Sequence, residues 1–124
     1  MGAKYDYKQL DVYKKSMTLV MMVYALLRKF PKEEQYALCD QLRRAVVSIP
    51  SNIAEGLGRY SSKEQVHFFE IAYGSLREVD CQLDIASKLG YITPEDLFEM
   101  TLQYEKVGAL ISGLRTKRLS STNP

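Results

Sequence analysis

The stretch QLRRAVVSIPSNIAEGLGR, residues 41–59, decides the fold, because it has the pattern of an amphipathic helix that continues through a proline. Its apolar side chains recur at alternating steps of three and four residues, which places them on one face of a helix. Pro50 lies inside this pattern, so we expect a kink in the helix and not its end. A proline in a helix interior costs an isolated helix about 3 kcal/mol, so tertiary packing must stabilise the segment. The apolar face consists of Cys39, Leu42, Val46, Ile49 and Ile53.

The other side of this helix is polar. Two interpretations of the polar side stay open: a solvated outer face, or a polar seam buried against another helix. We expect Gly56 or Gly58 to end the helix in a left-handed conformation. The polar side carries Arg44, Ser48, Ser51 and Glu55.

Three further amphipathic segments surround this helix. Pro31 ends the first, and Ser61 with Glu64 forms a capping box that begins the third. Gly90 ends the third, and Thr93 followed by Pro94 begins the fourth. No segment has the alternating pattern of a strand. The expected helices cover about residues 8–29, 34–57, 62–89 and 94–116.

Short connections between these helices make sequence neighbours antiparallel. We therefore predict an all-α fold: a single domain over residues 1–124, built as an antiparallel up-down-up-down four-helix bundle with a proline-kinked second helix. At 124 residues and 46% hydrophobic, the chain is large enough to bury a core.

The first helix carries two apolar stripes, which together make an arc wider than one bundle core requires. An exposed apolar surface of that size usually binds a partner. We interpret the second stripe as an oligomer interface, the alternative being deep burial within one chain. The first stripe is Leu10, Tyr13, Met17, Val20, Tyr24 and Leu27; the second is Val12, Leu19, Val23, Leu26 and Phe30.

Charge and hydropathy restrict the location and the ligands. The longest apolar run, residues 19–27, is far shorter than the roughly 20 residues that span a bilayer, and no signal peptide precedes it. We expect a cytoplasmic protein without membrane contact. The net charge of +2 does not by itself indicate a nucleic-acid-binding protein. Residues 1–30 nevertheless hold six Lys or Arg and two acids, while residues 61–90 hold three and five.

The residues of common catalytic sites are missing from the sequence. Residues 64–67, EQVH, match one half of the Glu-x-x-His motif of di-iron bundles, but His67 is the only histidine. A nucleophilic serine needs a histidine base, and neither Ser48 nor Ser51 has one nearby in the sequence. The glycines of residues 56–59 do not follow a strand, as those of a phosphate-binding loop would. We therefore expect no metal, no cofactor, no catalytic residue and no small-molecule substrate.

Five segments carry a family resemblance: LDVYKKS (10–16), FP (30–31), LCDQLRRAVVSIPSNIAEG (38–56), FFEIAYGSLREVDCQL (68–83) and LGYI (89–92). They resemble the bacterial four-helix bundle proteins first noticed as products of intervening sequences in 23S ribosomal RNA genes. That family includes the accessory variability proteins of diversity-generating retroelements. The resemblance covers about residues 8–92; Tyr13 stands where the family often has tryptophan, and Ala37 where it often has glycine.

The resemblance implies a bundle without enzymatic activity that assembles into a homo-oligomeric ring, with five protomers expected. It also implies a nucleic-acid role, since the retroelement relatives look like partners of a reverse transcriptase and its RNA. A ring would multiply a weak positive charge per chain. The candidate nucleic-acid-binding residues are Lys14, Lys15, Arg28, Lys29, Arg43 and Arg44.

Two alternatives remain open at this stage. Arg43 or Arg44 could instead pair with Glu55 or Glu78 between helices. At the level of function, an oligomeric bundle that binds RNA or assists a reverse transcriptase competes with an oligomeric protein-interaction scaffold that binds no nucleic acid.

Overall fold

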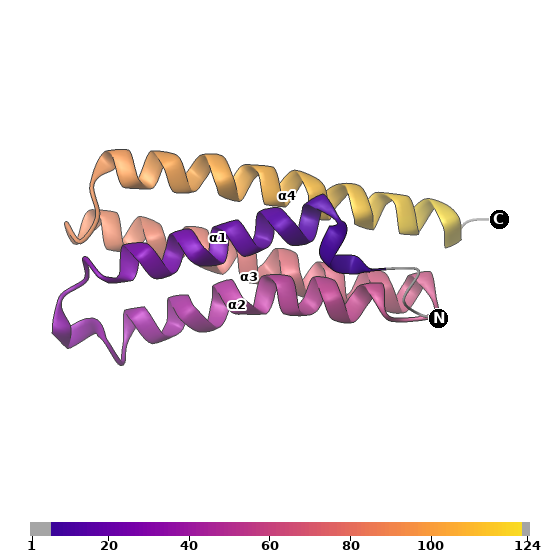
Figure 1. Cartoon of the computed structure of the whole chain (residues 1–124), viewed down its shortest axis with the longest axis horizontal. Coiled ribbons are helices and arrows are strands. Elements are labelled where there is room, and N and C mark those ends of the chain that lie inside the picture. The colour runs from indigo at the N-terminus through magenta and orange to yellow at the C-terminus, as the bar shows by residue number, and fades with distance from the viewer. Residues whose placement is uncertain (1–5, 123–124) are drawn as a thin grey trace.

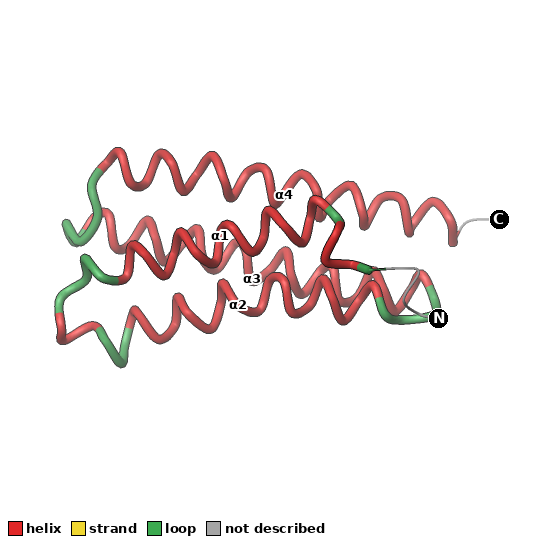
Figure 2. The backbone as a smooth tube through the Cα atoms, viewed as in Figure 1, coloured by secondary structure: helices red, strands yellow, loops and turns green. Residues whose placement is uncertain are grey.

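The computed structural model describes residues 6–122, and every regular element in this part of the chain is a helix (Figures 1 and 2). The predicted all-α fold with four helices is confirmed. The α-helices are α1 (Asp11–Leu27), α2 (Leu38–Leu57), α3 (Ser62–Lys88) and α4 (Pro94–Thr122). Two 3-10 turns, Tyr7–Gln9 and Lys32–Glu34, precede α1 and α2.

These 3-10 turns explain why α1 and α2 begin later than the sequence pattern predicts. The Asp6 carboxylate accepts a hydrogen bond from the Lys8 amide and caps the first turn, and α1 begins only after Leu10. The second turn covers part of the predicted 34–57 segment, so α2 begins at Leu38. α4 continues beyond the predicted residue 116 to Thr122.

The four helices lie side by side. Figure 1 shows the α1–α2 and α3–α4 connections at one end of the molecule and the α2–α3 connection at the other. Each helix contacts its neighbours in sequence, and α1 also contacts α4. The contacts of α3 with α2 and with α4 are more extensive than those α1 makes. α1 is therefore the helix held by the smallest amount of packing.

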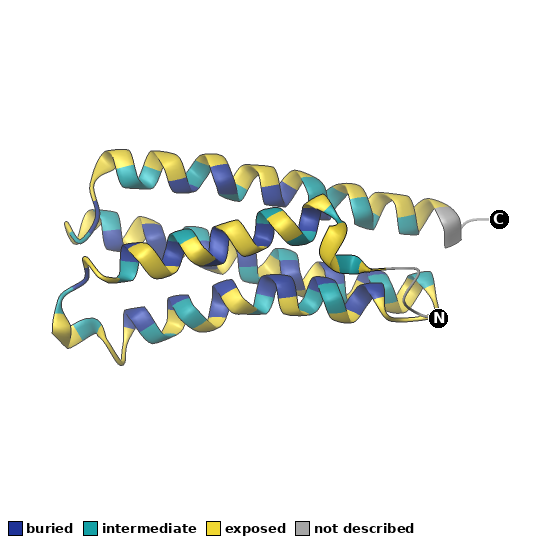
Figure 3. Cartoon of the chain, in the orientation of Figure 1, coloured by how far each residue is buried: buried dark blue, intermediate teal, exposed yellow. Residues whose placement is uncertain are grey.

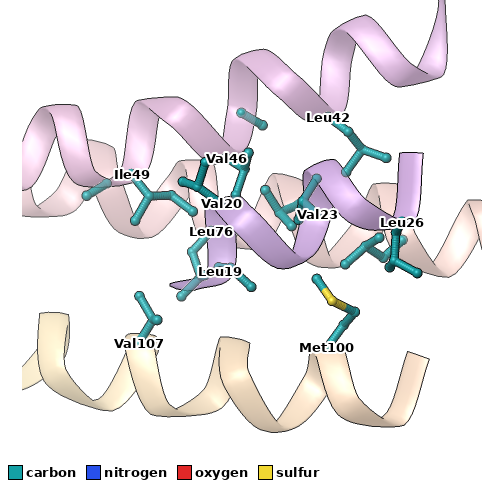
Figure 4. Close-up of a cluster of buried hydrophobic side chains, with 14 of the residues drawn as sticks. Leu19, Val20, Val23, Leu26, Leu42, Val46, Ile49, Leu76, Met100 and Val107 are labelled. Carbon is teal, nitrogen blue, oxygen red and sulfur yellow. The ribbon is translucent and has the colours of Figure 1, made fainter. Parts of the chain in front are cut away.

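The hydrophobic core lies on the sides of the helices that face one another (Figure 3). Figure 4 shows its centre, where side chains from all four helices meet, including Leu19, Val46, Leu76 and Val107. Each of these four is completely buried. Full burial of such a side chain contributes roughly 1.5–3 kcal/mol, so the core supplies the packing that an internal proline in α2 requires.

The predicted oligomer interface on the first helix is wrong, because all five of its residues belong to the core of a single chain. Leu19 and Val23 are 0% exposed, and the other three are at most 9% exposed. The excess apolar surface of α1 lies instead on the first stripe and its outer edge, where Met17 and Tyr24 are exposed. The misplaced residues are Val12, Leu19, Val23, Leu26 and Phe30.

Pro50 lies inside α2, which continues on both sides of it. A bend at Pro50 stays a prediction. The expected left-handed cap at Gly56 or Gly58 is wrong: Gly58 has φ −88°, and Gly90 is the one residue with positive φ in the described part of the chain. Gly90 has φ 81° and ends α3, where the Tyr91 amide donates to the Ala86 carbonyl at 2.9 Å.

The polar side of α2 has two parts: one is a polar seam against another helix, and the other is a solvated outer face. On the side facing α3, the Ser48 and Ser75 hydroxyls hydrogen-bond at 2.8 Å, and Asn52 Nδ2 donates to Ser48 Oγ at 2.9 Å. These residues form a polar seam. Arg44, Ser51 and Glu55 are exposed and form the solvated outer face.

Asp96 joins the start of α4 to the end of α1. Thr93 Oγ1 accepts from the Asp96 amide and Asp96 Oδ2 accepts from the Thr93 amide, each at 3.0 Å, as in a capping box. Lys29 Nζ lies 2.7 Å from the same Asp96 oxygen. The hydrogen bond from Lys29, with that from the Thr93 amide, lowers the pKa of Asp96 below its ordinary value of 3.8.

The lowered pKa of Asp96 predicts a pH dependence of stability. A carboxyl with a lower pKa in the folded chain stabilises fully above the unfolded pKa and loses that effect as the pH falls through the folded pKa. We expect Asp96→Asn to lower the free energy of unfolding at neutral pH and to lose this effect below pH 3.8. Urea unfolding across pH measures it, with the exposed Glu99→Gln as control. A pH-independent difference would contradict the role of the charge.

Candidate nucleic-acid interface

A groove of about 250 Å³ lies between α1 and α2, over the proline of α2. Tyr13 and Tyr7 form part of its wall, with ring centroids 5.1 Å apart and planes inclined by 77°. Tyr7 reaches this position because the capped 3-10 turn precedes α1. The groove therefore offers aromatic rings beside apolar side chains. Its lining is Tyr7, Tyr13, Met17, Val20, Val47, Pro50, Ser51 and Ala54.

Beside the groove, the outward face of α1 carries an apolar stripe with a cation at each end. The stripe follows steps of three and four residues, so its side chains share one helical face. Met21, at its centre, is 66% exposed. The side chains of Lys14 and Arg28, at its ends, have no ion pair or hydrogen-bond partner among the described residues. We call this face the α1 stripe: Lys14, Met17, Met21, Tyr24 and Arg28.

The six basic residues singled out in the sequence do not form one uniform patch. Lys29 is paired with Asp96, and Arg44 Nε lies 3.7 Å from Asp40 Oδ2. Arg43 donates to the Gln35 carbonyl at 3.0 Å. Lys14, Lys15 and Arg28 stay unpaired in the part of the chain that the structure describes. The six thus divide into three engaged and three available cations.

The alternative prediction, that Arg43 or Arg44 forms an ion pair with Glu55 or Glu78, is wrong. Neither Arg43 nor Arg44 pairs with Glu55 or Glu78 among residues 6–122. Glu55 pairs instead with Arg59, four residues further along the chain and just beyond the end of α2. Arg44 finds its carboxylate within its own helix, at the i,i+4 position where helical side chains are neighbours.

The groove and the α1 stripe were only partly visible in the sequence. Tyr13, Met17 and Tyr24 stand out in the first apolar stripe, but Met21 belongs to neither predicted stripe. The signal that identifies it is the spacing of Lys14, Met21 and Arg28, which are seven residues apart. Tyr7 lies before α1, and helical periodicity does not extend to it.

Titratable groups give no catalytic constellation in the described residues. His67 is exposed on α3 and packs edge-on against Phe68, with ring centroids 5.2 Å apart. Glu64 donates its amide to the Ser61 hydroxyl and begins α3. Within residues 6–122, no three His, Cys, Asp or Glu side chains gather as a metal site would require. No described helix combines the length and the apolar character needed to cross a membrane.

Comparisons with known proteins agree with this architecture. A crystal structure of a protein with unknown function from the S23 ribosomal protein family of Bacteroides thetaiotaomicron superimposes with a TM-score of 0.77. It is 20% identical, and the match covers 84% of this chain and 97% of that one. No curated protein matches the sequence. The family described as 23S rRNA-intervening sequence protein matches residues 8–113. The chain therefore belongs to the 23S rRNA-intervening sequence protein family.

Proposed function

We propose that this chain is a non-enzymatic, homo-oligomeric bundle that binds single-stranded RNA through the groove and the α1 stripe. The observation that carries the proposal is that Lys14 and Arg28, whose side chains are unpaired among the described residues, share α1 with the half-buried Tyr13 and the exposed Tyr24. Surfaces that bind single strands combine cations for the phosphates with aromatic rings on which bases stack. Tyr13 in the groove and Tyr24 on the α1 stripe supply such rings.

The family description supports RNA as the ligand, because it places related proteins with the 23S rRNA gene. The resemblance to accessory proteins of retroelements extends the proposal to a reverse transcriptase, whose RNA the same face would hold. Assembly raises the affinity that one weakly charged chain can reach, because each protomer adds its own cations to the field.

Assembly is supported by exposed apolar side chains on the two helices away from the RNA-binding face. Ile71 and Ile85 lie on the same outward side of α3, and Phe98 with Leu102 lies on α4. Phe98 is 64% exposed. Two distinct apolar faces permit a head-to-tail contact, which closes into a ring when the rotation per subunit fits. A ring of five protomers is our proposal for the closed form.

One experiment on the full chain tests both statements. Sedimentation gives the mass, which we expect to be a multiple of the 14.2 kDa chain. Binding of a mixed-sequence single-stranded RNA is then measured across a salt series. Electrostatic binding weakens steeply with salt, by about 0.7 unit of log–log slope for each phosphate contact to a single strand. A 14.2 kDa species, or no RNA binding at low salt, would overturn the corresponding half of the proposal.

The cations of the α1 stripe make a specific prediction within this experiment. Lys14→Ala with Arg28→Ala should weaken RNA binding and lower the salt slope by about 1.4 per protomer, because two phosphate contacts to a single strand are lost. The matched control is Lys63→Ala with Arg77→Ala, which removes two exposed cations of α3 that have no ion pair within residues 6–122. An equal loss in both double variants would mean that only the total charge matters.

A second candidate function is a protein-interaction scaffold that binds no nucleic acid. The observation in its favour is the apolar character of the α1 stripe between its end cations, with Met17, Met21 and Tyr24 all exposed. An exposed apolar helix face of this kind is also what a partner helix binds. The salt series distinguishes the two functions, since a scaffold shows no salt-dependent RNA binding.

A further inference from the structure

A second, chemically different cleft lies between α2 and α3. Its volume of about 440 Å³ is within the range of about 300–1,000 Å³ typical of small-molecule sites. Most of the side chains that line this cleft are polar, whereas the α1–α2 groove is lined mainly by aromatic and apolar side chains. It is lined by Gln41, Arg44, Ala45 and Ser48 of α2 and by Ser75 and Glu78 of α3.

Opposite charges line this cleft without pairing with each other. Arg44 contributes from α2 and Glu78 from α3, yet the ion pair of Arg44 is with Asp40 on its own helix, at 3.7 Å. The Arg44 side chain is 81% exposed, and a surface pair of this kind contributes little. The Glu78 carboxylate has no ion pair or hydrogen bond among the described residues. A ligand can therefore contact the Glu78 carboxylate directly, and the Arg44 guanidinium by displacing its weak surface pair with Asp40.

The polar side chains around the cleft are partly fixed in place. Gln82 is only 6% exposed, and its Nε2 donates to Gln41 Oε1 at 3.3 Å. Gln82 Oε1 accepts no hydrogen bond within residues 6–122. The seam of Ser48 and Ser75 lies against the cleft, with its hydroxyls already bonded to each other. The serine seam beside the cleft is thus satisfied within the chain, whereas the Glu78 carboxylate keeps its hydrogen-bonding capacity.

We propose that this cleft binds a guanine base. Guanine offers the acceptors O6 and N7 to an arginine fork, which is the commonest specific arginine–base contact. On its adjacent Watson–Crick edge it also offers two parallel donors, N1–H and N2–H, which match the two oxygens of a carboxylate. Arg44 reads the first edge and Glu78 the second. Adenine, cytosine and uracil lack this pair of parallel donors.

The inference rests on the proposed function for the source of the base, a guanine within the bound RNA. The cleft lies on the α3 side of α2, and the groove lies on the α1 side. Contacts at the cleft therefore add base preference to a surface that otherwise binds the backbone and stacks bases without distinguishing them.

The test uses free nucleotides, so that it does not depend on RNA binding. The full chain is titrated with GMP, AMP, CMP and UMP, followed by amide chemical shifts. We expect GMP to bind about tenfold more tightly than the other three, and the largest shifts to fall on the cleft residues. Equal affinity for all four would show binding of the phosphate alone and would overturn the proposal, as would no binding of GMP.

Single substitutions test which residues produce the preference for GMP over the other nucleotides. Glu78→Gln should remove about the whole tenfold preference for GMP, because the amide presents a donor to one of the two guanine donors. Asp84→Asn, which removes an exposed carboxylate of the same helix, should keep it. A preference that survives Glu78→Gln, in a variant with unchanged helical content, would overturn the assignment. Lys14→Ala with Arg28→Ala should leave GMP binding intact. The titration with nucleotides therefore tests the guanine site, and the salt series tests RNA binding, independently of each other.

Discussion

Val23→Asp should abolish the folded bundle, not separate folded subunits. Val23 is 0% exposed and lies in the centre of the core, between side chains of the other helices (Figure 4). An unpaired carboxylate at such a site costs several kcal/mol, in addition to the lost apolar contacts. The total stability of a small domain is about 5–15 kcal/mol. Circular dichroism at room temperature should therefore show a large loss of helical signal.

Met21→Asp is the matched control for this variant. It places the same carboxylate two residues away on the same helix, at a position that is 66% exposed. We expect its helical content and melting temperature to stay close to those of the unmodified chain. The two-stripe interpretation of the sequence predicts the opposite for Val23→Asp, namely folded chains of monomeric mass. If the Val23→Asp chain were folded and monomeric, Val23 would lie in the subunit interface and not in the core.

Gly56→Ala should destabilise the bundle although alanine is the better helix former. A Cβ at Gly56 would lie 2.8 Å from Phe69 Cε1 and 3.0 Å from Phe68 Cβ. Phe69 is completely buried, so its ring has no free space into which it can move. Overpacking of this kind costs about 1–3 kcal/mol. Urea unfolding should show a lower midpoint with an unchanged slope.

Gly113→Ala is the control for steric contact at Gly56. Gly113 lies in α4, and a Cβ there would meet no atom within 4 Å. Replacing it should raise the free energy of unfolding by about 0.5–1 kcal/mol, since glycine is a poor helix former. If both alanines stabilised the chain, the contact between α2 and Phe69 would be looser than the structure indicates.

Helical periodicity predicted the elements because each core stripe repeats its spacing over many turns. Leu42, Val46 and Ile49 are buried, as the pattern of α2 predicts. The same periodicity cannot decide which of two adjacent stripes faces the core, because both have the same spacing. In α1 the decision depends on where α2 and α4 lie, which is information from the whole fold. The oligomer interface was misplaced for this reason.

The basic residues show a second limit of sequence reasoning. Lys14 and Lys29 have the same character in the sequence, yet Lys29 is held by a carboxylate of α4 and Lys14 is not. Which cation is engaged depends on side chains 67 residues apart in the chain. Glycine had a similar ambiguity: Gly56 ends no helix and instead allows close packing against Phe69.

The less extensive packing of α1 against the other helices has a consequence for its dynamics. A helix with fewer tertiary contacts opens at a lower free energy than the rest of a domain, and its amides then exchange with solvent sooner. α1 carries one wall of the aromatic groove, with Tyr13, Met17 and Val20, so the groove is lost whenever α1 detaches. A ligand that contacts both α1 and α2 must reduce how often α1 detaches. Slowed amide exchange in α1 would then report occupancy of the groove even where the ligand itself is invisible to the measurement.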